Sequence, residues 1–229
     1  MPNLVCVYKS GGDYSAEYIS RLMAGFRRHN PGGDWKTVCL TDRQEEVAAV
    51  HNLPDSILKL RNNWPGWWAK MEMFSIPPPC LYLDLDTVVL GNLEDAFGAH
   101  DSTLLGLRDF GVPSRFETGV MAWKTNLEGI VDEFRDDVSR GTWMRNHLVV
   151  FGVDYPGDGA WLRDYIIREH VSTGWIQLYL SGIASYKYDV AGKELPQTAK
   201  LVCFHGLPRP GQVQNNLKWL VENWGGSLK

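Results

Sequence analysis

The sequence predicts an α/β protein in which helices cover a mainly parallel central sheet. Short apolar runs typical of buried strands alternate with amphipathic segments, most clearly in the first half of the chain. Glycine- and proline-rich stretches separate these segments, as the ends of strands and helices require. The strands are expected at residues 4–8, 36–40, 80–83, 103–107, 119–123 and 200–204. The helices are expected at residues 14–29, 44–50, 67–74, 127–138, 157–167 and 213–224.

The first expected helix shows how each of these elements is identified. Tyr18, Leu22 and Phe26 recur every four residues, so they lie on one helical face. Residues 30–33 read Asn-Pro-Gly-Gly and end the helix, because proline and glycine do not continue it. Three prolines at residues 77–79 in the same way separate the helix at 67–74 from the strand that follows.

Length and composition indicate one domain over residues 1–229 with an ordinary globular core, since 44% of the residues are hydrophobic and 22% charged. The formal net charge of −4 argues against a nucleic-acid or anionic-membrane partner. No apolar run is long enough to span a bilayer, and no signal-length segment opens the chain. Four cysteines lie singly in apolar runs, which suits a reducing compartment, so a cytoplasmic location is expected.

Two carboxylates close together are the most informative feature of the sequence. Asp84 and Asp86 follow the apolar strand at 80–83 and so lie at its carboxyl edge, where open α/β sheets bind ligands. If the chain stays extended, both side chains point the same way while Leu85 points into the protein. Two such carboxylates repel each other unless a cation lies between them or one of them takes a proton. A divalent metal that prefers oxygen ligands, Mn²⁺ or Mg²⁺, is the simplest partner.

A second group of polar residues follows the last expected strand. His205 comes directly after the apolar run at 201–204, so its imidazole could complete an Asp, Asp, His ligand set. Gly206 and Arg209 follow in a short loop that also holds two prolines. A fixed guanidinium in such a loop is suited to binding a diphosphate.

The segment around Asp84 and Asp86 resembles the DxD segment of glycosyltransferase family 8, the glycogenin-like group of retaining enzymes with the GT-A fold. Four further segments resemble other motifs of that family in the same order along the chain. These are residues 68–74, 116–121, 157–162 and 204–210. The resemblance extends over residues 4–210 and implies a GT-A domain that transfers a hexose with retention.

The resemblance implies a metal site and a catalytic pair. Asp84, Asp86 and His205 would bind Mn²⁺, and the ion would bridge the diphosphate of a UDP-glucose or UDP-galactose type donor. Asp158 would face the donor sugar and Lys70 would approach the donor, so these two are the expected catalytic residues. The acceptor would be a glycan or another hydroxyl compound.

The resemblance also implies a nucleotide site. Val7 and Tyr8, at the end of the first strand, would contact the uracil and ribose. Gly206 and Arg209 would contact the diphosphate, with Arg209 in the place of the family's lysine. Lys70 and Asp84 would complete the donor site.

Several positions depart from the family pattern. Glu117 and Thr118 replace the usual asparagine and serine beneath the donor sugar, so the identity of the transferred sugar stays open. Gly159 stands where an amide side chain is usual beside Asp158, and Gly211 stands where glycogenin has a tryptophan. The pattern therefore indicates a bacterial or viral relative rather than a glycogenin.

Two other functions fit part of the sequence. Residues 84–88 also resemble the nucleophile loop of haloacid-dehalogenase-type phosphatases, although that family usually begins with this motif. A nucleotide-sugar-binding protein without transfer activity is the other alternative, because Gly159 and Glu117 depart from the transferase pattern.

One aromatic cluster and one pair of acidic residues have no part in the predicted donor site. The tryptophans Trp64, Trp67 and Trp68 form a cluster that either stacks on a sugar acceptor or packs in the core. Asp136 and Asp137 are expected on the solvated face of the helix at 127–138.

Overall fold

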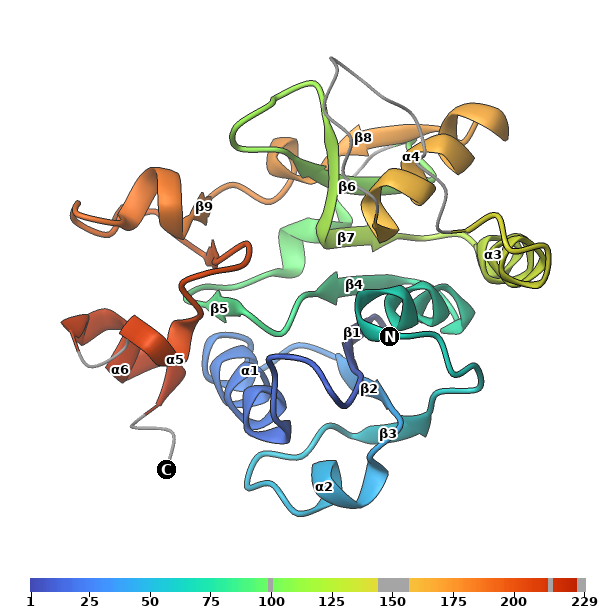
Figure 1. Cartoon of the computed structure of the whole chain (residues 1–229). Helices are drawn as coiled ribbons and strands as arrows, with labels where there is room; N and C mark the ends of the chain where they lie inside the picture. The colour runs from blue at the N-terminus through green and yellow to red at the C-terminus, as the bar shows by residue number, and fades with distance from the viewer. Residues whose placement is uncertain (99–100, 144–156, 214–215, 226–229) are drawn as a thin grey trace.

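A computed structural model of the chain describes residues 1–98, 101–143, 157–213 and 216–225, and the arrangement of its elements is shown in Figure 1. Its main feature is a seven-stranded sheet in the order β3-β2-β1-β4-β7-β6-β8. The strands are β1 (Asn3–Tyr8), β2 (Lys36–Thr41), β3 (Ser56–Lys59), β4 (Cys80–Leu83), β6 (Leu104–Arg108), β7 (Phe116–Trp123) and β8 (Thr173–Trp175). All of them run in one direction except β7, which is antiparallel to β4 and β6. The predicted mainly parallel α/β sheet is therefore confirmed.

A second, smaller sheet lies beside the carboxyl end of β4 (Figure 1). It has the order β5-β10-β9, from β5 (Thr87–Val89), β10 (Leu201–Cys203) and β9 (Ile183–Ser185). β10 pairs antiparallel with β5 and parallel with β9. Only β10 among these three strands was expected from the apolar runs.

Helices lie on both faces of the main sheet, except the last one. They are α1 (Ala16–His29), α2 (Gln44–Ala48), the 3₁₀ helix η1 (Gly66–Ser75), α3 (Glu128–Ser139), α4 (Asp158–Arg168) and α6 (Lys218–Trp224), which packs against α1 and β5. Shorter turns are η2 (Glu94–Phe97), η3 (Ile176–Leu178), the π-helical η4 (Tyr186–Val190) and α5 (Pro210–Val213). The last helix was predicted over 213–224, but α6 begins at Lys218 because Leu217 is its extended N-cap residue. None of the helices in the described ranges has the length and apolarity that crossing a membrane requires.

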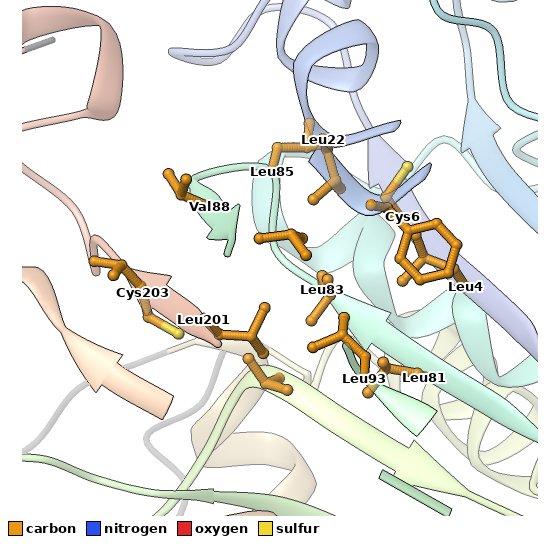
Figure 2. Packing of buried hydrophobic residues seen from close by; sticks show 14 of the residues in the cluster. Leu4, Cys6, Leu22, Leu81, Leu83, Leu85, Val88, Leu93, Leu201 and Cys203 are labelled. Carbon is orange, nitrogen blue, oxygen red and sulfur yellow. The ribbon is translucent and has the colours of Figure 1, made fainter. Parts of the chain in front are cut away.

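The alternation of side chains along the buried strands produces two cores. In β1, Leu4 and Cys6 belong to the core beneath α1, whereas Val5 and Val7 belong to the core beneath η1, α3 and α4. Figure 2 shows part of the first core, in which Leu22 of α1 belongs to the same cluster as residues from β1, β4, β5 and β10. The two sheets are therefore joined through one apolar cluster, which fixes the small sheet against the end of β4.

Candidate active site

The chain turns sharply at the end of β4. The amide of Asp84 donates to the carbonyl of Gly119 on β7 at 2.9 Å, and the amide of Thr87 donates back to the carbonyl of Asp84 at 3.0 Å. The extended geometry predicted through Asp86 is therefore wrong, because this turn interrupts it. Leu85 does point into the protein, as expected, and is 2% exposed.

The turn leads directly into β5, and the pairing of β5 with β10 determines what lies opposite the acidic residues. Thr87 is the partner of Cys203 in this antiparallel ladder. Continuing the register by one residue on each strand places Phe204 opposite Asp86. The loop that carries His205 and Arg209 is therefore brought to the carboxylates by backbone pairing.

Lys70 is the centre of the first polar cluster. Its ammonium lies 2.9 Å from Oδ1 of Asp84 and 3.1 Å from Oδ2 of Asp158. It also donates to Oγ1 of Thr118 at 3.3 Å, and Thr118 in turn donates to Asp158 at 2.7 Å. The hydroxyl of Tyr82 donates to Oδ1 of Asp84 at 2.6 Å. The structure thus brings together the two residues predicted to be catalytic, Lys70 and Asp158, with the first predicted metal ligand.

The electrostatics of this cluster favour a charged lysine. Burial alone would lower the pKa of Lys70, but the carboxylates of Asp158 and Asp84 outweigh it, and the pKa is raised. Burial raises the pKa of Asp84 to about 6, and the neighbouring Asp86 adds to this while Lys70 opposes it. A carboxylate with a raised pKa gains from an added cation, which is the property expected at a metal site.

Arg209 is the centre of the second polar cluster. Its guanidinium forms an ion pair with Asp86, which is 4% exposed, and donates to Oδ2 of Asp13 at 3.1 Å. It also lies over the ring of Tyr14, 4.7 Å from the centroid. The predicted phosphate-binding cation therefore neutralises the second predicted metal ligand. The sequence had not indicated Asp13 or Tyr14, which follow the first strand in an otherwise featureless glycine loop.

His205 lies close to this cluster in an unusual backbone conformation. Its φ is 47° and that of Gly206 is 85°, so two successive residues are left-handed. Lys187 donates to the carbonyl of His205 at 2.7 Å, and Phe110 contacts the imidazole with ring centroids 4.9 Å apart. The Nε2 atom is buried without a hydrogen-bond partner, and burial lowers the pKa of the ring. A neutral imidazole with a free nitrogen is suited to binding a metal.

The three predicted metal ligands do not form a complete coordination sphere. Within the described ranges, no three His, Cys, Asp or Glu side chains come close enough together to hold an ion. The carboxylate oxygens of Asp84 instead pair with Lys70, and those of Asp86 pair with Arg209. The negative charge of Asp86 partly opposes the lowering of the His205 pKa by burial, so the two side chains act on each other electrostatically.

The loop after β1 is held in place by Asp42 at the end of β2. This carboxylate accepts from the amide and hydroxyl of Ser10, at 2.9 and 2.7 Å, and pairs with Lys9 at 2.9 Å. Val7 and Tyr8 are both buried in β1, and the Tyr8 hydroxyl donates to Glu46 at 3.2 Å. Asp42 thus fixes the loop predicted to bind the nucleotide, a role that its position in the sequence did not indicate.

Glu117 and Arg115 line two hollows beside these clusters, and Arg163 lines one of the two. Arg115 pairs with Glu117 at 2.8 Å, and Arg163 lies 3.6 Å from the same carboxylate. Burial raises the pKa of Glu117 to about 7. One hollow, of about 200 Å³, also borders His205. The other, of about 270 Å³, borders Asp158 and Arg163.

The tryptophan cluster is divided by the structure. Trp64 and Trp68 are core residues, 5% and 6% exposed, and both contact the ring of Phe134. Trp67 between them is 61% exposed. The packing alternative is therefore correct for two of the three tryptophans.

The chain was compared with known proteins. No family model and no curated protein sequence matches it. Among solved structures it is similar to the glycosyltransferase GlyE of Streptococcus pneumoniae TIGR4, with 17% identity and a TM-score of 0.64 over 98% of this chain and 62% of that one. The apo form of GlyE gives a TM-score of 0.62 at 17% identity, over 97% of this chain and 60% of that one.

A second similar protein is the galactosyltransferase LgtC, solved in complex with donor and acceptor sugar analogues. It gives a TM-score of 0.62 at 12% identity, over 96% of both chains. The present chain therefore spans about three-fifths of the length of GlyE but nearly all of LgtC. At these identities the similarity concerns the fold, which is of the GT-A type, as expected.

Proposed function

We propose that the protein is a glycosyltransferase that moves a hexose from a UDP-sugar, of the UDP-glucose or UDP-galactose type, to a hydroxyl acceptor. The observation that carries this proposal is the pair of carboxylates at the carboxyl edge of β4, each neutralised by its own internal cation. The GT-A fold supports it, because the similar structures GlyE and LgtC are described as a glycosyltransferase and a galactosyltransferase. The same fold disfavours a haloacid-dehalogenase-type phosphatase.

The donor atoms of Asp84, Asp86 and His205 suit a divalent cation such as Mn²⁺ or Mg²⁺, but the three side chains must move closer together, and Arg209 must release Asp86, before they can hold it. Asp84 and Asp86 offer carboxylate oxygens, and His205 has a buried Nε2 without a partner. In the proposed complex these three residues hold the ion. When bound, the ion adds positive charge beside the diphosphate and so stabilises it as a leaving group.

The other residues act on the donor directly. Arg209 is proposed to leave Asp86 and bind the diphosphate, for which its guanidinium has the right geometry. Gly206 allows the backbone of the same loop to approach the phosphates, because it has no side chain. Val7 and Tyr8 position the loop that meets the nucleotide.

Lys70 and Asp158 are proposed to act on the donor sugar. Lys70 pairs with Asp158 and, together with the Thr118 hydroxyl, fixes the position of its carboxylate. A carboxylate held there stabilises positive charge that develops at the anomeric carbon as the bond to phosphate breaks. Transfer with retention is part of the proposal, and Asp158 or the departing phosphate would shield one face of the sugar.

The test is a comparison of two aspartate variants. Asp86→Ala should abolish Mn²⁺-dependent UDP binding in calorimetry and release of UDP from UDP-glucose or UDP-galactose, while circular dichroism stays unchanged. The matched control is Asp95→Ala, which removes an exposed carboxylate paired with Lys200 at 2.7 Å. The control should bind UDP like the wild type. Unchanged UDP affinity in Asp86→Ala with Mn²⁺ present would refute the proposed site.

A further inference from the structure

The exposed indole of Trp67 is the feature that the proposed donor site leaves unused. Its neighbours Trp64 and Trp68 pack against Phe134, so they fix the start of η1 without help from Trp67. The Trp67 side chain is 61% exposed and makes no hydrogen bond or ring contact with the described residues. The core therefore does not need this ring, although the local backbone holds it in a defined place.

The helix that carries Trp67 directs it toward the site. Side chains three residues apart lie above one another in a 3₁₀ helix, and Trp67 and Lys70 have this spacing within η1. Trp67 therefore lies on the same face of η1 as Lys70, one turn earlier. Lys70 on this face contacts Asp158, so the face is directed toward the site. Its Nε1 atom is 3.6 Å from the point where a Cβ on Gly157 would stand, and Gly157 is the N-cap residue of α4.

A polar hollow begins where the indole ends. Gly157, Asp158 and Arg163 line the hollow of about 270 Å³ together with Glu117. A Cβ at Gly159 would stand 3.5 Å from Nη1 of Arg163, so the glycine keeps this surface open beside the guanidinium. A flat apolar face next to charged hydrogen-bonding groups matches a pyranose ring, which has apolar C–H faces and a rim of hydroxyls.

We propose that Trp67 stacks on a pyranose ring of the acceptor, and that the hydroxyls of this ring meet Arg163 and Glu117 in the adjoining hollow. The acceptor class is then a saccharide rather than a protein or lipid hydroxyl. This inference rests on the proposed function, because it assigns the second substrate of the same site. Trp67 acts as a binding residue for the acceptor and takes no part in bond breaking.

The test measures saccharide binding without requiring turnover. Saturation-transfer NMR and calorimetry are carried out with UDP and Mn²⁺ present, on methyl β-glucoside, methyl β-galactoside, lactose and cellobiose. Trp67→Ala should weaken binding of the saccharide that the wild type prefers by about tenfold or more. Trp67→Phe keeps an aromatic face and should recover most of the affinity. Ile167→Ala, which removes another exposed apolar side chain near the far end of α4, is the control and should match the wild type.

Two results would overturn the inference. One is equal saccharide affinity in Trp67→Ala and the wild type, and the other is the absence of binding to any of these saccharides by the wild type. The affinity for UDP is measured in the same samples. Loss of UDP binding in the wild type would refute the proposed function, whereas the saccharide data would still decide the role of Trp67.

Discussion

Replacing Lys70 with methionine tests whether the central ion cluster stabilises the fold as well as the site. The substitution keeps most of the side-chain volume but leaves Asp84 and Asp158 without their shared cation, at 2.9 and 3.1 Å in the wild type. All three side chains are shielded from water, with 11%, 29% and 12% of the surface exposed for Lys70, Asp84 and Asp158. Solvent therefore screens this cluster less than it screens a surface pair.

The expected loss of unfolding free energy in Lys70→Met follows from the carboxylate charges that remain without a cation. Breaking a buried ion pair by removing one partner costs about 3–5 kcal/mol, because an uncompensated charge stays behind. We expect the lower end, about 3 kcal/mol, because Asp84 keeps its bond from Tyr82 and Asp158 keeps its bond from Thr118. For a chain of this length the melting temperature should fall by about 6–12 °C.

The assay is urea unfolding at neutral pH with a chelator present, so that metal binding does not contribute. Lys218→Met is the control, because Lys218 is 89% exposed and pairs only loosely with Glu222 at 3.7 Å. The control should stay within about 0.5 kcal/mol of the wild type. Adding Asp158→Asn to Lys70→Met should restore part of the loss, since it removes one of the stranded charges. A loss below about 1 kcal/mol in Lys70→Met would refute the reasoning.

Three further outcomes are expected. Asp137→Ala should lower the free energy of unfolding by about 1–3 kcal/mol, because the buried Trp161 Nε1 loses its hydrogen-bond acceptor at 2.7 Å. Asp136→Ala, on the exposed face of the same helix, is the control and should have little effect in the same urea titration. Glu117→Gln should gain thermal stability relative to the wild type as the pH rises from about 5 to about 8. The reason is that the folded-state pKa of Glu117 is raised to about 7, so its ionisation in the folded state is unfavourable; a pH-independent difference in melting temperature would contradict this. Finally, Mn²⁺ and UDP should each bind weakly alone and strengthen one another in calorimetry, and equal Mn²⁺ affinity with and without UDP would contradict this.

The main sheet could be predicted because its strands are long enough to show a pattern. β1, β2 and β4 are continuous apolar runs bounded by glycine, proline and polar residues, so their type and order were readable. The strands β5, β8 and β9 have three residues each, too few for a period to be recognised, whereas β10 is equally short but was found because it is wholly apolar and is followed by the buried Phe204. The turn at Asp84 was missed for a related reason. It depends on hydrogen bonds to Gly119 and within the turn, which no local pattern encodes.

The site was predicted as a set of residue types, but its contacts were not. Asp84, Asp158 and Lys70 were singled out from three separate segments, and the structure brings them into contact. Their ion pairs span long stretches of sequence, so only the fold could show that they share one cation. Asp137 was predicted on a solvated helix face, which is wrong, since it is 8% exposed and accepts from Trp161. Its burial follows from the packing of α4 against β7 and η1, which its own helix does not reveal.

The mutual dependence of Mn²⁺ and UDP follows from counting the charges around the end of β4. Three carboxylates, those of Asp84, Asp86 and Asp158, share two cations, Lys70 and Arg209. A divalent cation alone would therefore meet two positive side chains, and a diphosphate alone would meet the carboxylates. When both arrive, their charges cancel, and Arg209 can exchange the carboxylate of Asp86 for a phosphate without losing its ion pair. Coupling between two ligands is reciprocal, so UDP should raise the affinity for Mn²⁺ by the same factor as Mn²⁺ raises the affinity for UDP.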